Sequence, residues 1–73
     1  MRAPRQVSPA APLSRREAEV ATLVAQGCTN REIAERLVIS ERTAENHLQS
    51  ILNRLRLRSR TEIATWAVKN HLA

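Results

Sequence analysis

The chain has 73 residues, and its 12 Lys and Arg residues against 7 Asp and Glu residues give it a net charge of +5 at pH 7. This length holds one small domain with little scaffold for an enclosed pocket, and its single cysteine excludes an internal disulfide. Because no apolar run is long enough to span a membrane and no zinc-ligand spacing is present, we expect a small basic binding module without metal or cofactor.

The amino-terminal segment differs in composition from the rest of the chain. Pro4, Pro9 and Pro12 are the only prolines, and no apolar periodicity accompanies them. We expect residues 1–12 to form a disordered tail or the remnant of a linker. Residues 13–73 contain one glycine, no hairpin signal and much Ala, Leu, Arg and Glu, which predicts a single all-α domain.

Capping patterns mark the starts of four helices. In a capping box, a Ser or Thr hydroxyl accepts a hydrogen bond from the N–H three residues later, and a Glu at that later position accepts one from the N–H of the cap. The three boxes are Ser14/Glu17, Thr29/Glu32 and Ser59/Glu62. Ser40 before Glu41 gives a weaker fourth start, and Gly27 suits the left-handed position just past a helix end. The predicted helices of this four-helix bundle span residues 15–26, 30–37, 41–55 and 60–71.

The apolar residues agree with these limits. The third predicted helix carries its apolar side chains on one face, which comprises Ala44, Leu48, Ile51, Leu52 and Leu55. Cys28 and Ile33 are spaced to form a hydrophobic staple around the second helix start, which accounts for the lone cysteine. An unpaired cysteine also favours a reducing compartment, so we expect the chain in the cytoplasm.

The second and third predicted helices have the plan of a helix-turn-helix. A short helix, a turn at residues 38–40 and a longer helix form a unit whose last helix fits the major groove of DNA. The face of that helix opposite its apolar stripe carries Arg42, Glu45, Asn46, Gln49 and Asn53. Asn and Gln can hold adenine through two hydrogen bonds, Arg can hold guanine, and Glu can accept from cytosine. The pattern therefore predicts binding to double-stranded DNA.

The charge of the predicted domain is unevenly distributed. Residues 13–50 hold five arginines and six glutamates, a net charge of −1, whereas residues 51–73 have a net charge of +4. Four arginines alternate where the third helix ends and the fourth begins: Arg54, Arg56, Arg58 and Arg60. These arginines suit the phosphate backbone of DNA, with the alternative that they only solvate a loop and complement a helix C-terminus.

Several blocks of the sequence, in this order and spacing, resemble the LuxR-type (GerE) helix-turn-helix domain. They are Leu13-Ser-Arg-Arg-Glu17, Gly27-Cys-Thr-Asn-Arg-Glu-Ile-Ala34, Leu37-Val-Ile-Ser40, Thr43-Ala-Glu-Asn-His47 and Arg58-Ser-Arg60. The resemblance covers Leu13 to Leu72. It implies a four-helix output domain of a bacterial transcriptional regulator, whose third helix enters the major groove and whose fourth helix often mediates dimerisation.

The resemblance also implies roles for individual residues. The base-reading positions fall on Glu45, Asn46 and Gln49. To the positions that the family uses for the DNA backbone we add Arg42, from the outward face of the third helix, and Arg58, from the alternating arginines. The residues expected to contact the DNA backbone are Asn30, Ser40, Arg42, Thr43, His47, Arg54 and Arg58. The chain departs from the family pattern at Ala44, where Val is usual, and at Glu45, where Lys is common. It also lacks the usual Gly near the C-terminus, where Asn70 is a candidate for the left-handed cap.

Two interpretations of the last helix stay open at the level of sequence. Trp66 either closes the core against the first helix or, with Lys69, anchors a homodimer. We expect sequence-specific DNA binding by a dimeric transcriptional regulator. The resemblance leaves two alternatives open, an upstream regulatory domain that is not in this chain or a stand-alone protein. The alternative to DNA binding is a helical protein-binding module that pairs through its last helix and titrates other regulators.

An enzyme is not expected, because no nucleophile–base pair or phosphate-binding glycine loop occurs. Membrane binding is not expected either, because interfacial aromatics are lacking.

Overall fold

The computed structural model describes residues 12–72 and contains four helices within them. These are α1 (Arg15–Ala25), α2 (Asn30–Leu37), α3 (Glu41–Leu55) and α4 (Arg60–Lys69). The all-α prediction is confirmed, and every helix begins at its predicted residue. α1 and α4 end earlier than the predicted residues 26 and 71. The tail predicted for residues 1–12 lies, apart from Pro12, outside the described residues.

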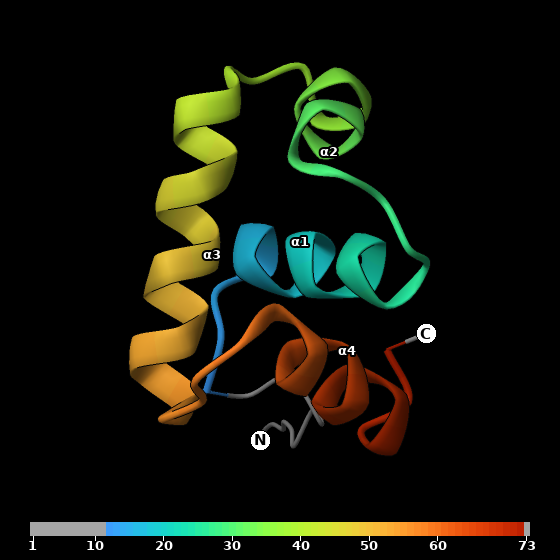
Figure 1. The fold of residues 1–73 in the computed structure, drawn as a ribbon, viewed down its shortest axis with the longest axis vertical. Helices are drawn as coiled ribbons and strands as arrows, with labels where there is room; N and C mark the ends of the chain where they lie inside the picture. Colours follow the sequence, from blue (N-terminus) through green and yellow to red (C-terminus); the bar gives the residue numbers. More distant parts are fainter. Residues whose placement is uncertain (1–11, 73) are drawn as a thin grey trace, which may run out of the picture.

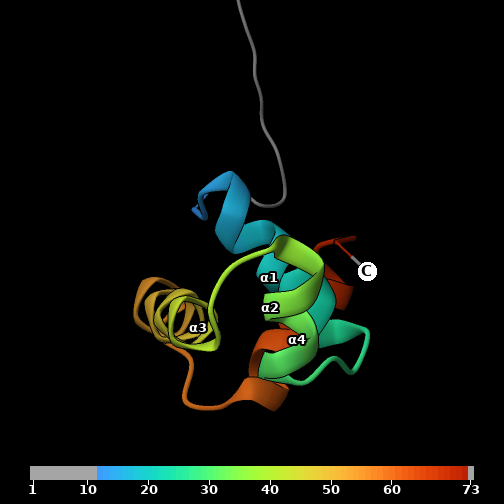
Figure 2. The ribbon, with the colours of Figure 1, turned by 90° about the horizontal axis from the view of Figure 1, so that it is seen from above.

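The helices pack around a small core to which each contributes. α3 runs along the long axis of the molecule at one side. α1 and α4 lie side by side and run crosswise to α3, and α2 lies near the start of α3 (Figures 1 and 2). α1 contacts all three other helices, and α3 also contacts α2 and α4. The largest fully buried side chains come one from each helix: Val20, Ile33, Ile51 and Ile63. Cys28 is buried in the same apolar cluster as Ile33, as the hydrophobic staple requires.

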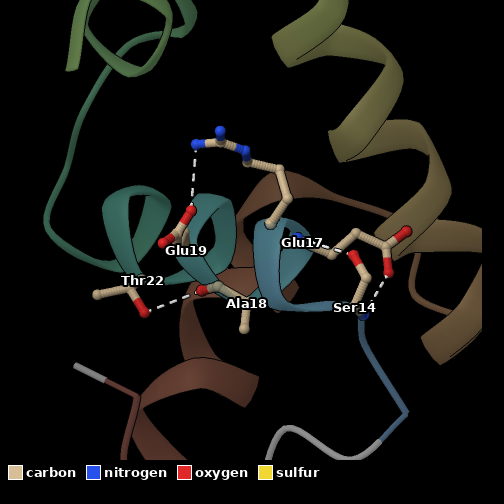
Figure 3. Close-up of polar contacts among 6 residues, drawn as sticks. Ser14, Glu17, Ala18, Glu19 and Thr22 are labelled. Atoms are coloured by element: carbon tan, nitrogen blue, oxygen red, sulfur yellow. Dashed lines mark hydrogen bonds and ion pairs between the residues drawn. The ribbon is translucent and has the colours of Figure 1, made fainter. Parts of the chain in front are cut away.

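Two of the three predicted capping boxes are complete. The Ser14 Oγ accepts from the Glu17 N–H at 3.1 Å, and Glu17 Oε1 accepts from the Ser14 N–H at 2.9 Å (Figure 3). Thr29 and Glu32 form the same reciprocal pair at the start of α2.

The capping box predicted at Ser59 is only half formed. The Ser59 hydroxyl accepts from the Glu62 N–H, but the Glu62 carboxylate accepts from the N–H of Arg58 instead of that of Ser59. Ser59 is more extended, with φ −146°, than the −68° and −77° of the two complete boxes. This backbone angle turns the Ser59 N–H away, so the carboxylate bonds to the residue before the cap.

Helix ends are closed by left-handed residues, as predicted at Gly27 but not at Asn70. Gly27 has φ +88°, and the N–H groups of Gly27 and Cys28 donate back to Val24 and Leu23, which is a Schellman motif. After α4, however, Asn70 has φ −102° and His71 takes the left-handed conformation with φ +63°. The prediction for Asn70 was wrong: its φ is negative, and its side-chain amide, like its backbone N–H, donates to the Trp66 carbonyl.

Val38 ends α2 in a strained conformation. Its φ and ψ of 57° and 50° are left-handed, where a Cβ costs roughly 1–2 kcal/mol, and its side chain is 89% exposed. We expect Val38→Gly to raise the free energy of unfolding by about 0.5–1 kcal/mol, since relief of strain exceeds the extra chain entropy of glycine. Urea denaturation measures the change.

A Val38→Ala variant is the control for this substitution. It removes the exposed methyl groups but keeps the Cβ, so most of the backbone strain remains. Equal stabilisation by the two variants would contradict the strain argument, because it would locate the effect in the exposed side chain.

Candidate DNA interface

The turn between α2 and α3 is held by backbone and hydroxyl hydrogen bonds. The Ala34 carbonyl accepts from the N–H groups of both Val38 and Ile39. Ser40 caps α3, because its hydroxyl accepts from the Thr43 N–H at 3.0 Å while donating to the Thr43 hydroxyl at 2.9 Å. These bonds close the end of α2 and the start of α3, and the two helices joined by this short turn confirm the helix-turn-helix plan.

α3 has one buried and one exposed face. Its buried residues are Ala44, Leu48 and Ile51, on the stripe predicted from the sequence. The five polar side chains of the opposite face are all exposed: Arg42, Glu45, Asn46, Gln49 and Asn53. The end-on view shows α3 at the edge of the bundle (Figure 2). Gln49 donates to Asn53 one turn later, at 3.3 Å. The three predicted base-reading residues therefore lie on one accessible helix face.

The predicted backbone-contacting residues lie in three parts of the fold. Asn30 is the first residue of α2. Ser40, Arg42 and Thr43 lie at the start of α3 and His47 lies, half-buried, near its middle. Arg54 and Arg58 lie at the other end of that helix and in the following connection. The structure thus gathers Ser40, Arg42 and Thr43 in one helical turn and separates them from the two arginines by the length of α3.

Arg54 has a structural partner that the sequence did not reveal. Its Nε lies 3.1 Å from Oε2 of Glu17, so an ion pair joins the last turn of α3 to the first turn of α1. The Glu17 carboxylate is buried, whereas the Arg54 side chain is 54% exposed. Arg54 therefore holds α3 against α1. Only the exposed part of its side chain is available for contact with DNA.

The Glu17 carboxylate stays charged despite its burial. Burial acts to raise the pKa of Glu17, but the Ser14 N–H, the Ser50 hydroxyl and the Arg54 guanidinium together outweigh it and lower that pKa. Figure 3 shows the carboxylate turned toward α3, away from the other polar contacts of α1. Glu17 thus completes the capping box of α1 and also binds α3 through Arg54.

Arg60 forms a second long-range contact that sequence reasoning missed. Its guanidinium donates to Oδ1 of Asn30, at 2.6 Å, and to the carbonyl of Cys28. The sequence held one signal for this contact. Arg60 is the first residue of α4, where the positive end of the helix disfavours a cation that has no acceptor nearby.

Comparison with known proteins identifies the family. A family model described as "Bacterial regulatory proteins, luxR family" (GerE) matches residues 11–67. The chain belongs to the luxR family of bacterial regulatory proteins. This membership confirms the resemblance that the sequence blocks indicated.

Several proteins similar to this chain are named as regulators. The chain is 43% identical to the transcriptional regulatory protein LiaR of Bacillus subtilis and 43% identical to the oxygen regulatory protein NreC of Staphylococcus carnosus. Each match covers 82% of this chain and 28% of the relative, so the chain spans less than a third of their length. The crystal structure of the response regulator ChrA, from a heme-sensing two-component system, matches with a TM-score of 0.75 and 38% identity. That match covers 97% of this chain and 33% of ChrA. Together with the family, these relatives support DNA-binding transcription regulation.

The last helix of this luxR-family chain keeps an apolar surface exposed. Its core contacts are made by Ile63 and Ala67, whereas Trp66 packs against the core only in part. Trp66 lines a shallow hollow with Leu57, Glu62, Thr65 and Lys69. Val68 nearby is 57% exposed. The expectation that Trp66 closes the core is thus only partly met, because part of its ring stays at the surface.

None of the helices in residues 12–72 is both long and apolar enough to cross a membrane. Within the same residues, His, Cys, Asp and Glu nowhere gather in a group of three that could hold a metal ion.

Proposed function

We propose that this domain binds double-stranded DNA sequence-specifically, with α3 in the major groove, as the output domain of a transcriptional regulator. The observation that carries the proposal is the outer face of α3. Its side chains can each hydrogen-bond to a base edge, and all are exposed while the opposite face is fixed in the core. The luxR-family membership supports it. On this proposal the domain works in the bacterial cytoplasm, where the DNA lies.

The proposed mechanism divides positioning from reading. Hydroxyl and amide groups at the starts of α2 and α3, together with Arg54 and Arg58, contact phosphates and set the register of the protein on the duplex. Glu45, Asn46 and Gln49 then select bases. Glu45 is a selective element, since a carboxylate near phosphates is unfavourable unless it accepts from a base such as cytosine.

The experiment that tests DNA binding begins with selection from a random duplex library. The enriched duplex and a scrambled duplex are then compared by fluorescence anisotropy at two salt concentrations. We expect one enriched motif and an affinity that falls steeply with salt, as counterion release requires. A folded protein that enriches no motif and binds neither duplex would overturn the proposal in favour of the protein-binding alternative.

We further propose that two copies pair through α4 on a two-fold DNA site. A surface hollow lined by Ala64, Thr65, Val68 and Lys69 supports this pairing, because Val68 is 57% exposed there and would be covered by a second copy. Its continuation to Trp66 would supply the aromatic anchor that interfaces favour.

Val68→Asp tests this pairing. Because Val68 is mostly exposed in one copy, the variant should fold normally, but a buried carboxylate should weaken the dimer by at least about tenfold. Sedimentation equilibrium measures the dimer constant. Val38→Asp, an equivalent change at another exposed valine, is the matched control and should leave the constant unchanged. Equal dimerisation of the wild type and V68D would exclude α4 as the pairing surface.

A further inference from the structure

Arg60 joins two helices whose backbones do not approach each other closely. Close backbone approaches link α1 to every other helix and α3 to both α2 and α4, but none links α2 to α4. The two guanidinium hydrogen bonds of Arg60, to Asn30 Oδ1 and to the Cys28 carbonyl, cross this gap between the start of α4 and the start of α2.

The chemistry of this contact fixes the orientation of the Asn30 amide. A guanidinium can only donate hydrogen bonds, so Asn30 must turn its carbonyl oxygen toward Arg60. The Nδ2 group, with its two N–H donors, then points away from Arg60. Within residues 12–72 the Asn30 side chain has no other hydrogen bond.

This orientation matches the requirement of a DNA phosphate. Phosphate oxygens accept hydrogen bonds and never donate them, so an Asn that contacts a phosphate must present Nδ2 and not Oδ1. The N–H of Glu32, in the same helical turn, is already bonded to Thr29. The Asn30 amide is therefore a hydrogen-bond donor at the start of α2, and Arg60 determines the direction in which its N–H groups point.

We propose that Arg60 is a positioning residue for DNA binding, which acts by holding the Asn30 amide with its donors outward for a phosphate oxygen. This inference rests on the proposed function. Without Arg60, the amide rotates freely between an orientation that can donate to a phosphate and one that presents its oxygen to it. Binding must then select the donating orientation, and affinity falls.

A double-mutant cycle separates this role from the loss of a charge or of stability. Arg60→Met removes the guanidinium with little change in side-chain length, and Asn30→Ala removes the amide. We expect R60M to weaken binding to the enriched duplex about tenfold in the wild-type background and only about threefold in the N30A background. The residual threefold reflects the lost charge, which does not depend on Asn30.

Arg36→Met provides the matched control, because Arg36 is an exposed arginine at the other end of α2 with no hydrogen bond to Asn30. It should weaken binding by the same factor in both backgrounds. Circular dichroism verifies that every variant is folded at the assay temperature. If R60M does not fold, Arg60→Lys enters the same cycle, since it keeps the charge but not the fork that spans both acceptors.

Each outcome of the cycle has a definite meaning. Equal weakening by R60M in the two backgrounds, with wild-type binding intact, overturns the positioning role and leaves the proposed function standing. Absence of DNA binding by the folded wild type overturns the proposed function and this inference together. A lowered melting temperature with equal Kd values shows that Arg60 only stabilises the fold.

Discussion

Asn46→Ala and Gln49→Ala should each weaken binding to the enriched duplex by about 1–3 kcal/mol and leave binding to a scrambled duplex nearly unchanged. Both side chains are exposed on the outer face of α3, so their removal leaves the core intact. A bidentate contact to adenine exists only where the sequence supplies that base, which is why the loss is specific. Anisotropy titrations of both duplexes, at one salt concentration, measure the two effects.

Gln26→Ala is the control for these substitutions. Gln26 is an exposed residue just past the end of α1, outside the helix-turn-helix, so the variant should bind both duplexes as the wild type does. Equal losses on the enriched and the scrambled duplex for N46A would show that Asn46 contacts the backbone. The assignment of α3 as the reading helix would then need revision.

Glu17→Ala should lower the free energy of unfolding by about 2–3 kcal/mol at pH 7. The substitution removes half of a capping box, worth about 1 kcal/mol, and a hydrogen-bonded charge pair of which only the carboxylate is buried. Removal of one partner from a fully buried ion pair costs more, because it leaves an unpaired buried charge. That larger loss of stability does not apply here, because the Arg54 side chain is half exposed and can be solvated. Thermal and urea denaturation measure the loss.

The same carboxylate should make stability depend on pH. The pKa of Glu17 in the folded protein lies below 4.5, its ordinary value, so its contribution is complete above about pH 4.5. That contribution is lost as the pH falls through the lowered pKa, when the carboxylate is protonated in the native state. Glu32, whose pKa is lowered chiefly by the N–H of Thr29, acts in the same direction.

Glu17→Gln distinguishes the ion pair from other sources of acid sensitivity. Its amide oxygen can still accept from Ser14, but it carries no charge, so E17Q should be less stable than the wild type at pH 7. The difference in stability should shrink as the pH falls below 4.5 through the lowered pKa of Glu17. Glu35→Gln on the exposed face of α2 serves as control. A constant difference between E17Q and the wild type across this range would contradict the assignment.

The parts of the fold that could be predicted depend on residues close together in the chain. The starts of all four helices follow from caps whose partners lie three residues apart, and the exposed face of α3 follows from helical periodicity. The ion pair of Glu17 with Arg54 and the contact of Arg60 with Asn30 join residues 37 and 30 positions apart. The local sequence can indicate that Arg60 needs an acceptor, but it does not identify the partner in either pair, because the partner depends on how the helices pack.

Two predictions at helix ends, the capping box at Ser59 and the left-handed residue Asn70, were wrong because they too depend on the three-dimensional structure. The choice of Glu62 between two neighbouring N–H groups depends on the backbone angle of Ser59, and the left-handed residue after α4 is His71 instead of Asn70. For the candidate interface, sequence places Arg42, Glu45, Asn46 and Gln49 on one face. Sequence does not reveal that Arg54 is already paired with Glu17, so an Arg54→Ala variant would change stability as well as affinity for DNA.

Trp66 has a spectroscopic consequence. The chain has no Tyr or Phe, so all of its intrinsic fluorescence comes from this one indole on α4. Because Trp66 is half-buried at the edge of the core and beside Lys69, its emission responds both to loss of the packed core and to any partner that covers α4. A DNA duplex contacting only the far side of α3 would leave it largely unchanged. The Trp66 fluorescence of an unlabelled sample therefore reports on folding and on pairing. It is independent of the anisotropy of labelled DNA, which reports on DNA binding.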